Sequence, residues 1–218
     1  MCAKLDTTGL LADVTYAVFH GDDTADRERC CLYRRTDGGY WMTADLSLTW
    51  PFPTTQYVEI RAGADWRIES LDVRLSGSVR RDASHRAEDL TWQATIQTEE
   101  ATIERTVRCG PEVQVDFDSV WLKAITLNRL KLAPGQAQDV DVIQVKLPSL
   151  EPAPARGRYK CIGLERVATP AGDVDATHYV VSGVHHLWAD SRGIIVATRQ
   201  IVKRLPRGRR LLEYHWLG

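Results

Sequence analysis

Hydrophobic and polar residues alternate along much of the chain. One such stretch carries apolar residues at every second position, at Tyr40, Met42, Ala44, Leu46, Leu48 and Trp50. Leu90, Trp92, Ala94 and Ile96 repeat this pattern. A period of two is typical of β-strands with one buried face. Strands are also predicted around residues 14–18 and at 27–36, 56–61, 65–76, 101–108, 112–117, 137–146, 157–167, 175–183, 185–190, 193–203 and 209–216.

The residues between these strands indicate hairpins. Asp37-Gly38-Gly39 separates two predicted strands with residue types that tolerate positive φ. The strand at 65–76 changes phase, because Trp66 and Ile68 need one parity and the later apolar residues need the other. A bulge near Glu69–Ser70 would reconcile the two, and bulges bend strands.

One segment has helical spacing. Apolar residues recur at intervals of three and four between Phe117 and Leu127, and Asp116 or Asp118 would cap the start. We therefore expect a mostly β protein in which one curved antiparallel sheet forms an open or closed barrel, with a short helix near 117–128. The 218 residues suit a single domain. Its two halves are predicted to be joined by a stiff, Pro-rich connector at 148–154.

Charge and targeting signals narrow the class of protein. The net charge is −1, whereas nucleic-acid binders carry a basic surplus, so no nucleic-acid partner is expected. A local basic run at 203–210 is interpreted either as a solvated hairpin turn or as a clamp for an anionic head group. The N-terminus lacks a secretory pattern, and no apolar stretch reaches the length of a membrane span. Five cysteines without metal-ligand spacing favour reduced thiols, so we expect a cytoplasmic protein. We also expect no stable membrane insertion, and either a monomer or a homodimer.

Several short motifs resemble a known family. They are Ala-Asp-Trp-Arg at 64–67, Val-Asp-Phe-Asp at 115–118, Thr-Leu-Asn-Arg-Leu-Lys-Leu-Ala-Pro-Gly at 126–135 and Leu-Pro-Ser-Leu at 147–150. In these the chain is similar to the Putative glycolipid-binding family. Thr-Pro-Ala-Gly at 169–172 and Leu-Trp-Ala-Asp at 187–190, followed by Gly193, resemble related bacterial families. Both groups share the open, lipid-cupping β architecture of the lipoprotein carrier LolA, so the resemblance implies a curved sheet around a hydrophobic cavity.

Large aromatic residues are the candidate contacts for such a ligand. The chain has seven Trp and seven Tyr but only three Phe, and Trp and Tyr combine apolar area with a polar atom. The candidates are Tyr40, Trp50, Trp66, Trp92 and Trp121. The alternative for all five is ordinary core packing.

Arg105 is the candidate for a polar or charged part of the ligand. It shares the parity of Ala101, Ile103 and Val107, the apolar face of its strand. A charge on that face needs a partner, which could be Glu69 or an anionic ligand. The alternative is a position at the mouth of the barrel, where the guanidinium reaches water.

Catalytic candidates come from the C-terminal half. His178 or His186 beside Tyr214 could transfer protons, with Arg105 as a fourth member of the site. His185 precedes His186, so only one of the two can face a cavity from a regular strand. A structural role for these histidines is the alternative. Asp173, Asp175 and His178 lack a second firmly placed histidine, so no metal or other cofactor is expected.

Three functions compete on this evidence. The first is an intracellular binding protein for a hydrophobic or lipid-like small molecule. The second is a cofactor-independent enzyme of the cyclase, isomerase or dehydratase type, acting on a polyketide- or isoprenoid-like substrate in the same cavity. The third is a protein-interaction module that uses an open sheet edge and has no deep cavity.

Overall fold

The structure is a computed structural model that describes residues 7–20, 23–49, 53–202 and 205–218. Its elements are β1 (Thr7–His20), β2 (Asp23–Arg35), β3 (Tyr40–Leu48), β4 (Thr54–Ala62), β5 (Ile68–Gly77), β6 (Arg81–Glu88), β7 (Thr91–Gln97), β8 (Thr102–Arg108), β9 (Gln114–Asp116), α1 (Val120–Leu130), β10 (Ala137–Val145), β11 (Pro152–Thr169), β12 (Gly172–Val181), β13 (His185–Ala189), β14 (Ile195–Val202) and β15 (Leu205–Trp216).

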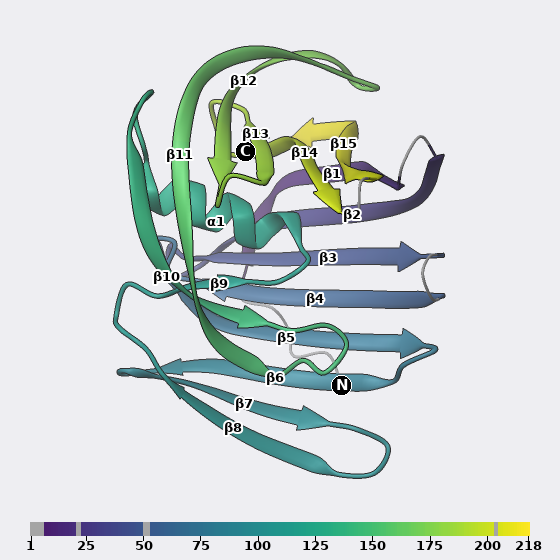
Figure 1. Cartoon of the computed structure of the whole chain (residues 1–218), viewed down its shortest axis with the longest axis vertical. Coiled ribbons are helices and arrows are strands. Elements are labelled where there is room, and N and C mark those ends of the chain that lie inside the picture. The colour runs from purple at the N-terminus through teal and green to yellow at the C-terminus, as the bar shows by residue number, and fades with distance from the viewer. Residues whose placement is uncertain (1–6, 21–22, 50–52, 203–204) are drawn as a thin grey trace.

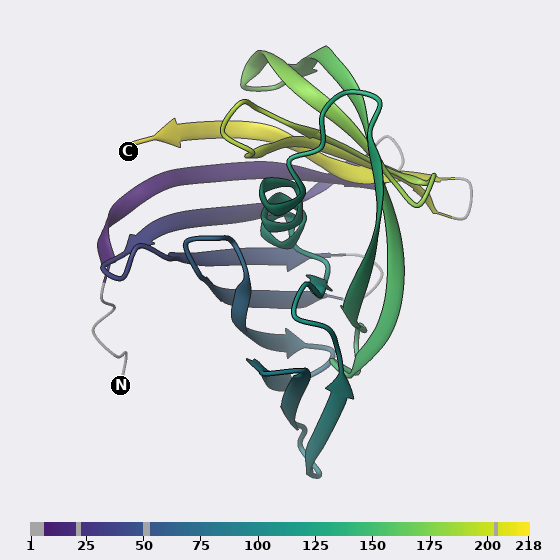
Figure 2. The ribbon, with the colours of Figure 1, turned by 90° about the vertical axis from the view of Figure 1, so that its left-hand side faces the viewer.

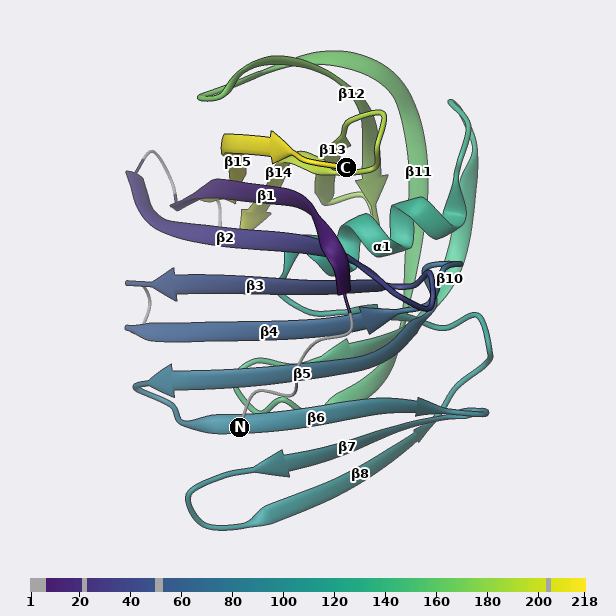
Figure 3. The ribbon, with the colours of Figure 1, turned by 180° about the vertical axis from the view of Figure 1, so that it is seen from behind.

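All the strands belong to one sheet. The order is β8-β7-β6-β5-β4-β3-β2-β1-β15-β14-β13-β12-β11-β10-β9, with β8 at one edge and β9 at the other, so the described sheet is not closed. Neighbouring strands are antiparallel except β9, which runs parallel to β10. Figures 1 and 3 show β3–β8 as one broad layer, with β11 and β12 arching over the opposite end. The predicted mostly β fold with one short helix is confirmed.

Strand pairing confirms the predicted turn and the predicted bulge. The turn between β2 and β3 contains Gly38 with a φ of 83°, a conformation that glycine adopts without steric cost. The ladder between β4 and β5 shifts where Arg61 pairs with Ser70 and Ala62 pairs with Ile68, which leaves Glu69 as the extra residue. Trp66 lies in the turn before β5 with a φ of 64°, so its predicted place on a strand face is wrong.

The helix fills the hollow of the sheet. Figure 2 shows α1 enclosed by the curl of the strands. It begins three residues later than predicted, and the side chain of Ser119, rather than that of either aspartate, accepts the N–H of Trp121 at its start. Trp121 donates its indole N–H to the carbonyl of Thr43 in β3 at 2.9 Å. The side-chain amide of Asn128 donates to the carbonyl of Gly193, which ties the helix to the other side of the hollow.

The Pro-rich segment near 148–154 does not connect two halves. Val145 at the end of β10 pairs with Pro152 at the start of β11, so the segment is the turn of a hairpin. The backbone N–H of Leu150 donates to the carbonyl of Lys146 within that turn. The prediction failed because prolines that suit an extended linker also suit a tight turn, and only the pairing of the flanking strands separates the two.

Side chains close the interior of the broad layer. The inner faces of β3–β7 carry buried apolar residues, including Met42, Ala44, Leu46, Val58, Ile60, Leu71, Val73, Leu75, Trp92, Ala94 and Ile96. They form one core with the apolar residues of α1. This part of the predicted hollow is therefore packed with side chains.

Candidate functional site

Two of the predicted aromatic contacts are part of the packed core. Trp92 and Trp121 are each 1% exposed. Trp92 donates its indole N–H to Nδ1 of His85 at 3.2 Å, and Trp121 is held by Thr43 as described. Both polar atoms of these indoles already have partners, so the core-packing alternative fits their positions.

The other aromatic candidates lie elsewhere. Tyr40 and Trp66 stack with ring centroids 3.9 Å apart, and the guanidinium of Arg34 lies 4.7 Å from the Tyr40 ring centroid. These rings form a partly buried pair at the start of β3. Trp50 lies outside the described residues.

Arg105 links the edge strand β8 to the turn between β10 and β11 across the opening of the sheet. Its Nε and Nη2 lie 2.9 and 2.7 Å from Oε1 of Glu151, at the start of β11, and its side chain is exposed. Glu69 pairs with Arg35 instead, so the predicted pairing of Arg105 with Glu69 is wrong. Arg81 makes a second link across this opening by donating to the carbonyl of Pro148 at 3.3 Å. Arg105 is therefore placed to hold β8 against the β10–β11 turn.

A cavity of about 480 Å³ opens beside the start of α1, and we call it the charged cavity. Its walls come from the segment leading into α1, the β10–β11 turn, β13, β14 and β15. Its lining residues are Asp116, Phe117, Asp118, Ser119, Val120, Lys123, Gln144, Val145, Lys146, Leu147, His185, His186, Leu187, Thr198, Arg199, Gln200, Arg207, Gly208 and Arg209. Five of these are Lys or Arg and two are Asp, so the cavity is basic rather than the greasy hollow that the sequence predicts.

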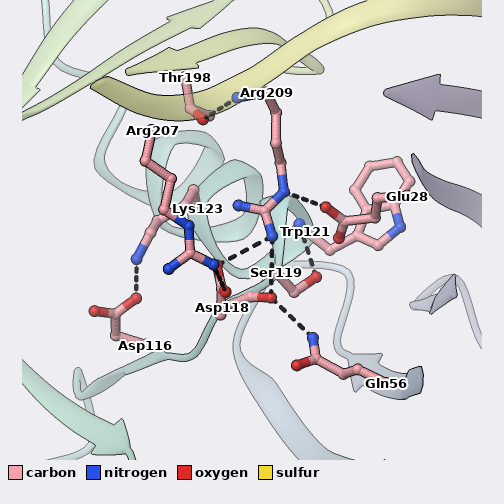
Figure 4. Close-up of polar contacts among 10 residues, drawn as sticks. All are labelled: Glu28, Gln56, Asp116, Asp118, Ser119, Trp121, Lys123, Thr198, Arg207 and Arg209. Carbon is pink, nitrogen blue, oxygen red and sulfur yellow. Dashed lines mark hydrogen bonds and ion pairs between the residues drawn. The ribbon is translucent and has the colours of Figure 1, made fainter. Parts of the chain in front are cut away.

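A buried ion network forms one wall of the charged cavity (Figure 4). The guanidinium of Arg209 binds the carboxylate of Glu28 on β2 and lies 3.0 Å from Oδ1 of Asp118. Arg207 lies 2.9 Å from the other oxygen of Asp118, and the carbonyl of Asp118 accepts the side-chain amide of Gln56 at 2.9 Å. We call Glu28, Asp118 and Arg209 the Arg209 network. It links β2, the start of α1 and β15.

The pKa values of this network follow from its burial. Burial alone would lower the pKa of Arg209, but the carboxylates of Glu28 and Asp118 raise it further than burial lowers it. The guanidinium therefore stays charged. Burial raises the pKa of Glu28, and Arg209 opposes that rise. Glu28 is fully buried and Arg209 is 8% exposed. Buried charges of this kind are stable only while each has its partner.

Two further titratable groups face the charged cavity. Lys123, on the first turn of α1, contacts Asp116 through Nζ. Burial and the charge of Arg209 lower the pKa of Lys123 to about 7. Burial and Lys123 lower the pKa of His185 to about 4, so this imidazole is neutral at pH 7. The contribution of His185 at pH 7 is therefore hydrogen bonding rather than charge.

Lys146 and Arg199 differ from the other basic residues of the charged cavity. Both are exposed, and neither makes an ion pair with any residue that the structure describes. Arg199 lies opposite His186 in the β13–β14 ladder. The cavity therefore has two cations that a bound molecule can neutralise.

The catalytic candidates separate into three places. Nδ1 of His178 lies 2.8 Å from Oε1 of Glu165, and Nε2 of His178 lies 2.9 Å from Nδ1 of His186. Tyr214 is not beside them, because its hydroxyl donates to Oδ2 of Asp190 at 2.9 Å. Arg105 is engaged at the sheet opening, so the structure brings together only the two histidines of the predicted catalytic set.

The side chains of His186 and Trp188 lie on the face of β13 opposite to that of Leu187, and His186 also borders the charged cavity. Side chains alternate along β13, so Leu187, which is buried on the inner face, shares that face with His185. His186 and Trp188 point to the other face. Trp188 stacks on His178 with ring centroids 4.6 Å apart and donates its indole N–H to Oε2 of Glu165 at 2.8 Å. Among the described residues, no cluster of three or more His, Cys, Asp or Glu side chains is arranged to hold a metal ion.

Sequence reasoning missed the residues that make the charged cavity. Asp116 and Asp118 were expected only as helix caps, and the run at 203–210 as a turn or a clamp. The sequence does indicate that Arg209 faces inward, because it lies two residues from the buried Leu211 and so shares its face of the strand. Its partner Glu28 lies 181 residues away in sequence, and no local pattern links the two. Residues 203 and 204 lie outside the described part of the chain.

The open, curved sheet around one helix defines a β-barrel-like protein with a basic cavity. The sequence profile of the family described as Putative glycolipid-binding matches residues 20–204, and the chain belongs to this family. None of the helices that the structure describes is long and apolar enough to cross a membrane. No curated protein matches the chain.

Two solved structures have a similar fold. One is a β-barrel-like protein of domain of unknown function DUF1849 from Brucella abortus, with a TM-score of 0.66 and 7% identity over 97% of this chain and 100% of that one. The other is a DUF1089 family protein from Pseudomonas aeruginosa, with a TM-score of 0.51 and 16% identity over 78% of this chain and 87% of that one. At these identities, the likeness concerns the fold alone.

Proposed function

We propose that the protein binds an amphiphilic, glycolipid-like molecule whose polar head occupies the charged cavity. The observation that carries this proposal is the cavity itself, about 480 Å³ in volume and lined by hydrogen-bonding and charged groups. That volume lies within the range of small-molecule sites. The family to which the chain belongs supports a ligand of this kind.

Apolar residues of the same cavity provide a place for the lipid part. Phe117, Val145 and Leu147 line it beside the charged groups, and Leu147 is 43% exposed. An alkyl chain covering such residues gains about 0.8 kcal/mol for each CH₂ group that it removes from water. The cavity thus offers polar and apolar contacts to the two ends of one ligand.

The charge of the cavity favours an acidic head. Asp116 and Asp118 are engaged by Lys123, Arg207 and Arg209, which leaves Lys146 and Arg199 to neutralise a ligand. A carboxylate, sulfate or phosphate accepts charge-assisted hydrogen bonds from such groups, which are stronger than neutral ones. We therefore expect a preference for acidic over neutral sugars.

Two detergents that differ at one position of the sugar test the proposal. Octyl glucoside and octyl glucuronide have the same chain and ring, but the second carries a carboxylate. Isothermal titration calorimetry below their micelle concentrations is expected to show binding of both, with the glucuronide about tenfold tighter, equivalent to one charge-assisted hydrogen bond. Absence of binding by either would reject the proposed function, whereas equal affinities would reject only the preference for acidic heads.

Matched variants assign the binding to the cavity. Replacing both Lys146 and Arg199 with Gln is expected to remove most of the difference between the two detergents, because both unpaired cations of the cavity are lost while its shape is kept. Replacing Arg105 with Gln is the control, since this arginine is engaged by Glu151 at the sheet opening. A loss of the difference in the Arg105 variant alone would place the head group at the sheet opening.

A further inference from the structure

A hydrogen-bonded series of side chains ends at His186 on the outer face of β13. Glu165 on β11, His178 on β12 and His186 on β13 follow one another at 2.8 and 2.9 Å, and we call them the histidine relay. Trp188 holds the second oxygen of Glu165 and stacks on His178. Three neighbouring strands therefore hold the relay in one arrangement.

The chemistry of these groups decides which nitrogen is basic. The Trp188 hydrogen bond and, beside it, His178 lower the pKa of Glu165, so its carboxylate can only accept hydrogen bonds. His178 must then donate from Nδ1 to Glu165. When both rings are neutral, Nε2 of His178 accepts a hydrogen bond from the Nδ1–H of His186. Nε2 of His186 consequently keeps its lone pair, and it has no partner among the described residues.

This nitrogen belongs to a side chain that lines an apolar groove. The groove has a volume of about 390 Å³ and is lined by Gly183, Val184, His186, Trp188, Arg199 and Gln200. A second hollow of about 270 Å³ also borders Trp188 and Arg199 and includes Phe19, Val167 and Ala168. We call the first of these the Trp188 groove. It contains a base, an apolar wall and one cation without an ion-pair partner.

We propose that the Trp188 groove is a proton-transfer site in which Nε2 of His186 is the general base. The substrate class is an apolar molecule with an acidic C–H bond beside a carbonyl. The proton passes from carbon to Nε2, and the C–H electron pair moves through the new C=C bond to the carbonyl oxygen. The resulting enolate lies beside Arg199, which stabilises its charge. When a C=C bond adjoins the reacting carbon, the proton returns to the far carbon of that bond, which completes an isomerisation without oxidant, reductant or cofactor.

His178 and Glu165 are positioning residues in this step. When Nε2 of His186 takes a proton, Nδ1 can pass its own proton to His178, and His178 can pass one to Glu165. The charge formed by proton uptake is then shared with a carboxylate instead of remaining on one ring. Charged and titratable groups around His186 come from every neighbouring strand: His178 from β12, Arg199 from β14, Glu165 from β11 and His185 from β13 itself. Burial, His178 and Arg199 lower the pKa of His186, and Glu165 opposes them.

The Kemp elimination of 5-nitrobenzisoxazole is a suitable probe, because it needs only a base in an apolar site. The base removes the C3 proton, the C–H electron pair completes a nitrile, and the N–O bond breaks to give a coloured phenolate. The wild-type protein is expected to exceed free imidazole at the same pH by about 100-fold in second-order rate constant, within the range for general-base catalysis. A rate no higher than that of imidazole would overturn the proposal.

Variants separate the base from its positioning residues. His186→Gln is expected to lose nearly all of the acceleration, whereas His215→Gln, which alters an exposed histidine near the C-terminus, should keep it. Glu165→Gln should lower the plateau rate and move the rising limb of the pH profile to lower pH, because loss of the carboxylate lowers the pKa of His186. Glu165→Asp should restore part of both effects. Full activity in His186→Gln would reject the base, and an unchanged pH profile in Glu165→Gln would reject the relay.

A measurement without any substrate tests the same arrangement. Nitrogen-15 NMR of the histidine rings is expected to show His186 protonated at Nδ1 and unprotonated at Nε2 at pH 7. The opposite tautomer would leave no base toward the Trp188 groove and would overturn the proposal. This readout also covers the case in which a variant folds poorly.

Discussion

The inner faces of β3–β7 and of β13–β15 belong to one continuous sheet but carry different side chains. The first is apolar and packed against α1, so the alternation of the sequence appears directly as burial. The second carries Thr198, Gln200, Arg207 and Arg209 toward the cavity. Packed apolar faces stabilise the fold, and the basic face lines the charged cavity beside α1. The C-terminal strands therefore carry the site that is proposed for binding.

The largest effect in this comparison of the two inner faces is expected from replacing Arg209 with Met. The substitution leaves Glu28 buried without its partner, and breaking a buried ion pair from one side costs about 3–5 kcal/mol in the free energy of unfolding. Urea denaturation measures this loss. Replacing both Glu28 and Arg209 with Met should recover much of it, because no unpaired charge remains. Equal stability of the single variant and the wild type would show that the Arg209 network is not structural.

The packed face contains its own buried polar group, His85. Burial lowers its pKa from 6.5 to about 4, and Trp92 donates to its Nδ1. The unfolded chain therefore takes up a proton at His85 more readily than the folded protein does. The contribution of neutral, buried His85 to the free energy of unfolding is complete above pH 6.5 and decreases as the pH falls toward 4. The shift corresponds to about 3 kcal/mol over that interval. Denaturation at several pH values should show a flatter slope for His85→Gln, and an identical slope would contradict the assignment.

Trp121 connects the helix to the packed face. Replacing it with Phe removes the hydrogen bond to the Thr43 carbonyl and a little apolar area, at a cost of about 1–2 kcal/mol. Because this indole has no part in the charged cavity, glucuronide affinity should stay within a factor of two of the wild type. A large loss of affinity with unchanged stability would instead make Trp121 a ligand contact.

The smallest effect is expected at Arg105. Its pair with Glu151 is exposed, and exposed pairs contribute less than about 1 kcal/mol. Arg105→Gln should lower stability by no more than that amount and leave detergent binding unchanged. Calorimetry of the variant measures both. A strong effect on binding would move the ligand site toward the sheet opening and blur the contrast between the two faces.

Local patterns predicted the fold better than the site. Alternation over 40–50 and 90–96, the turn at Gly38 and the bulge at Glu69 each depend on neighbouring residues, so the sequence contains them. The Arg209 network depends on Glu28 and Asp118, which meet only after distant strands have paired. The same limit explains Arg105, whose place on the apolar parity of its strand is unusual for a charge but whose partner, Glu151, lies across the opening of the sheet. The pairing of His178 with His186 was within reach, since adjacent hairpin strands carry them.

Photo-crosslinking with a glycolipid that carries a diazirine on its acidic sugar head tests the central claim most directly. Mass spectrometry of the digested protein is expected to find adducts on the segments that line the charged cavity, at 116–120, 144–147 and 185–187. Arg199→Gln should reduce their yield. Adducts confined to β3–β8, or a yield that is the same with denatured protein, would contradict binding in the charged cavity.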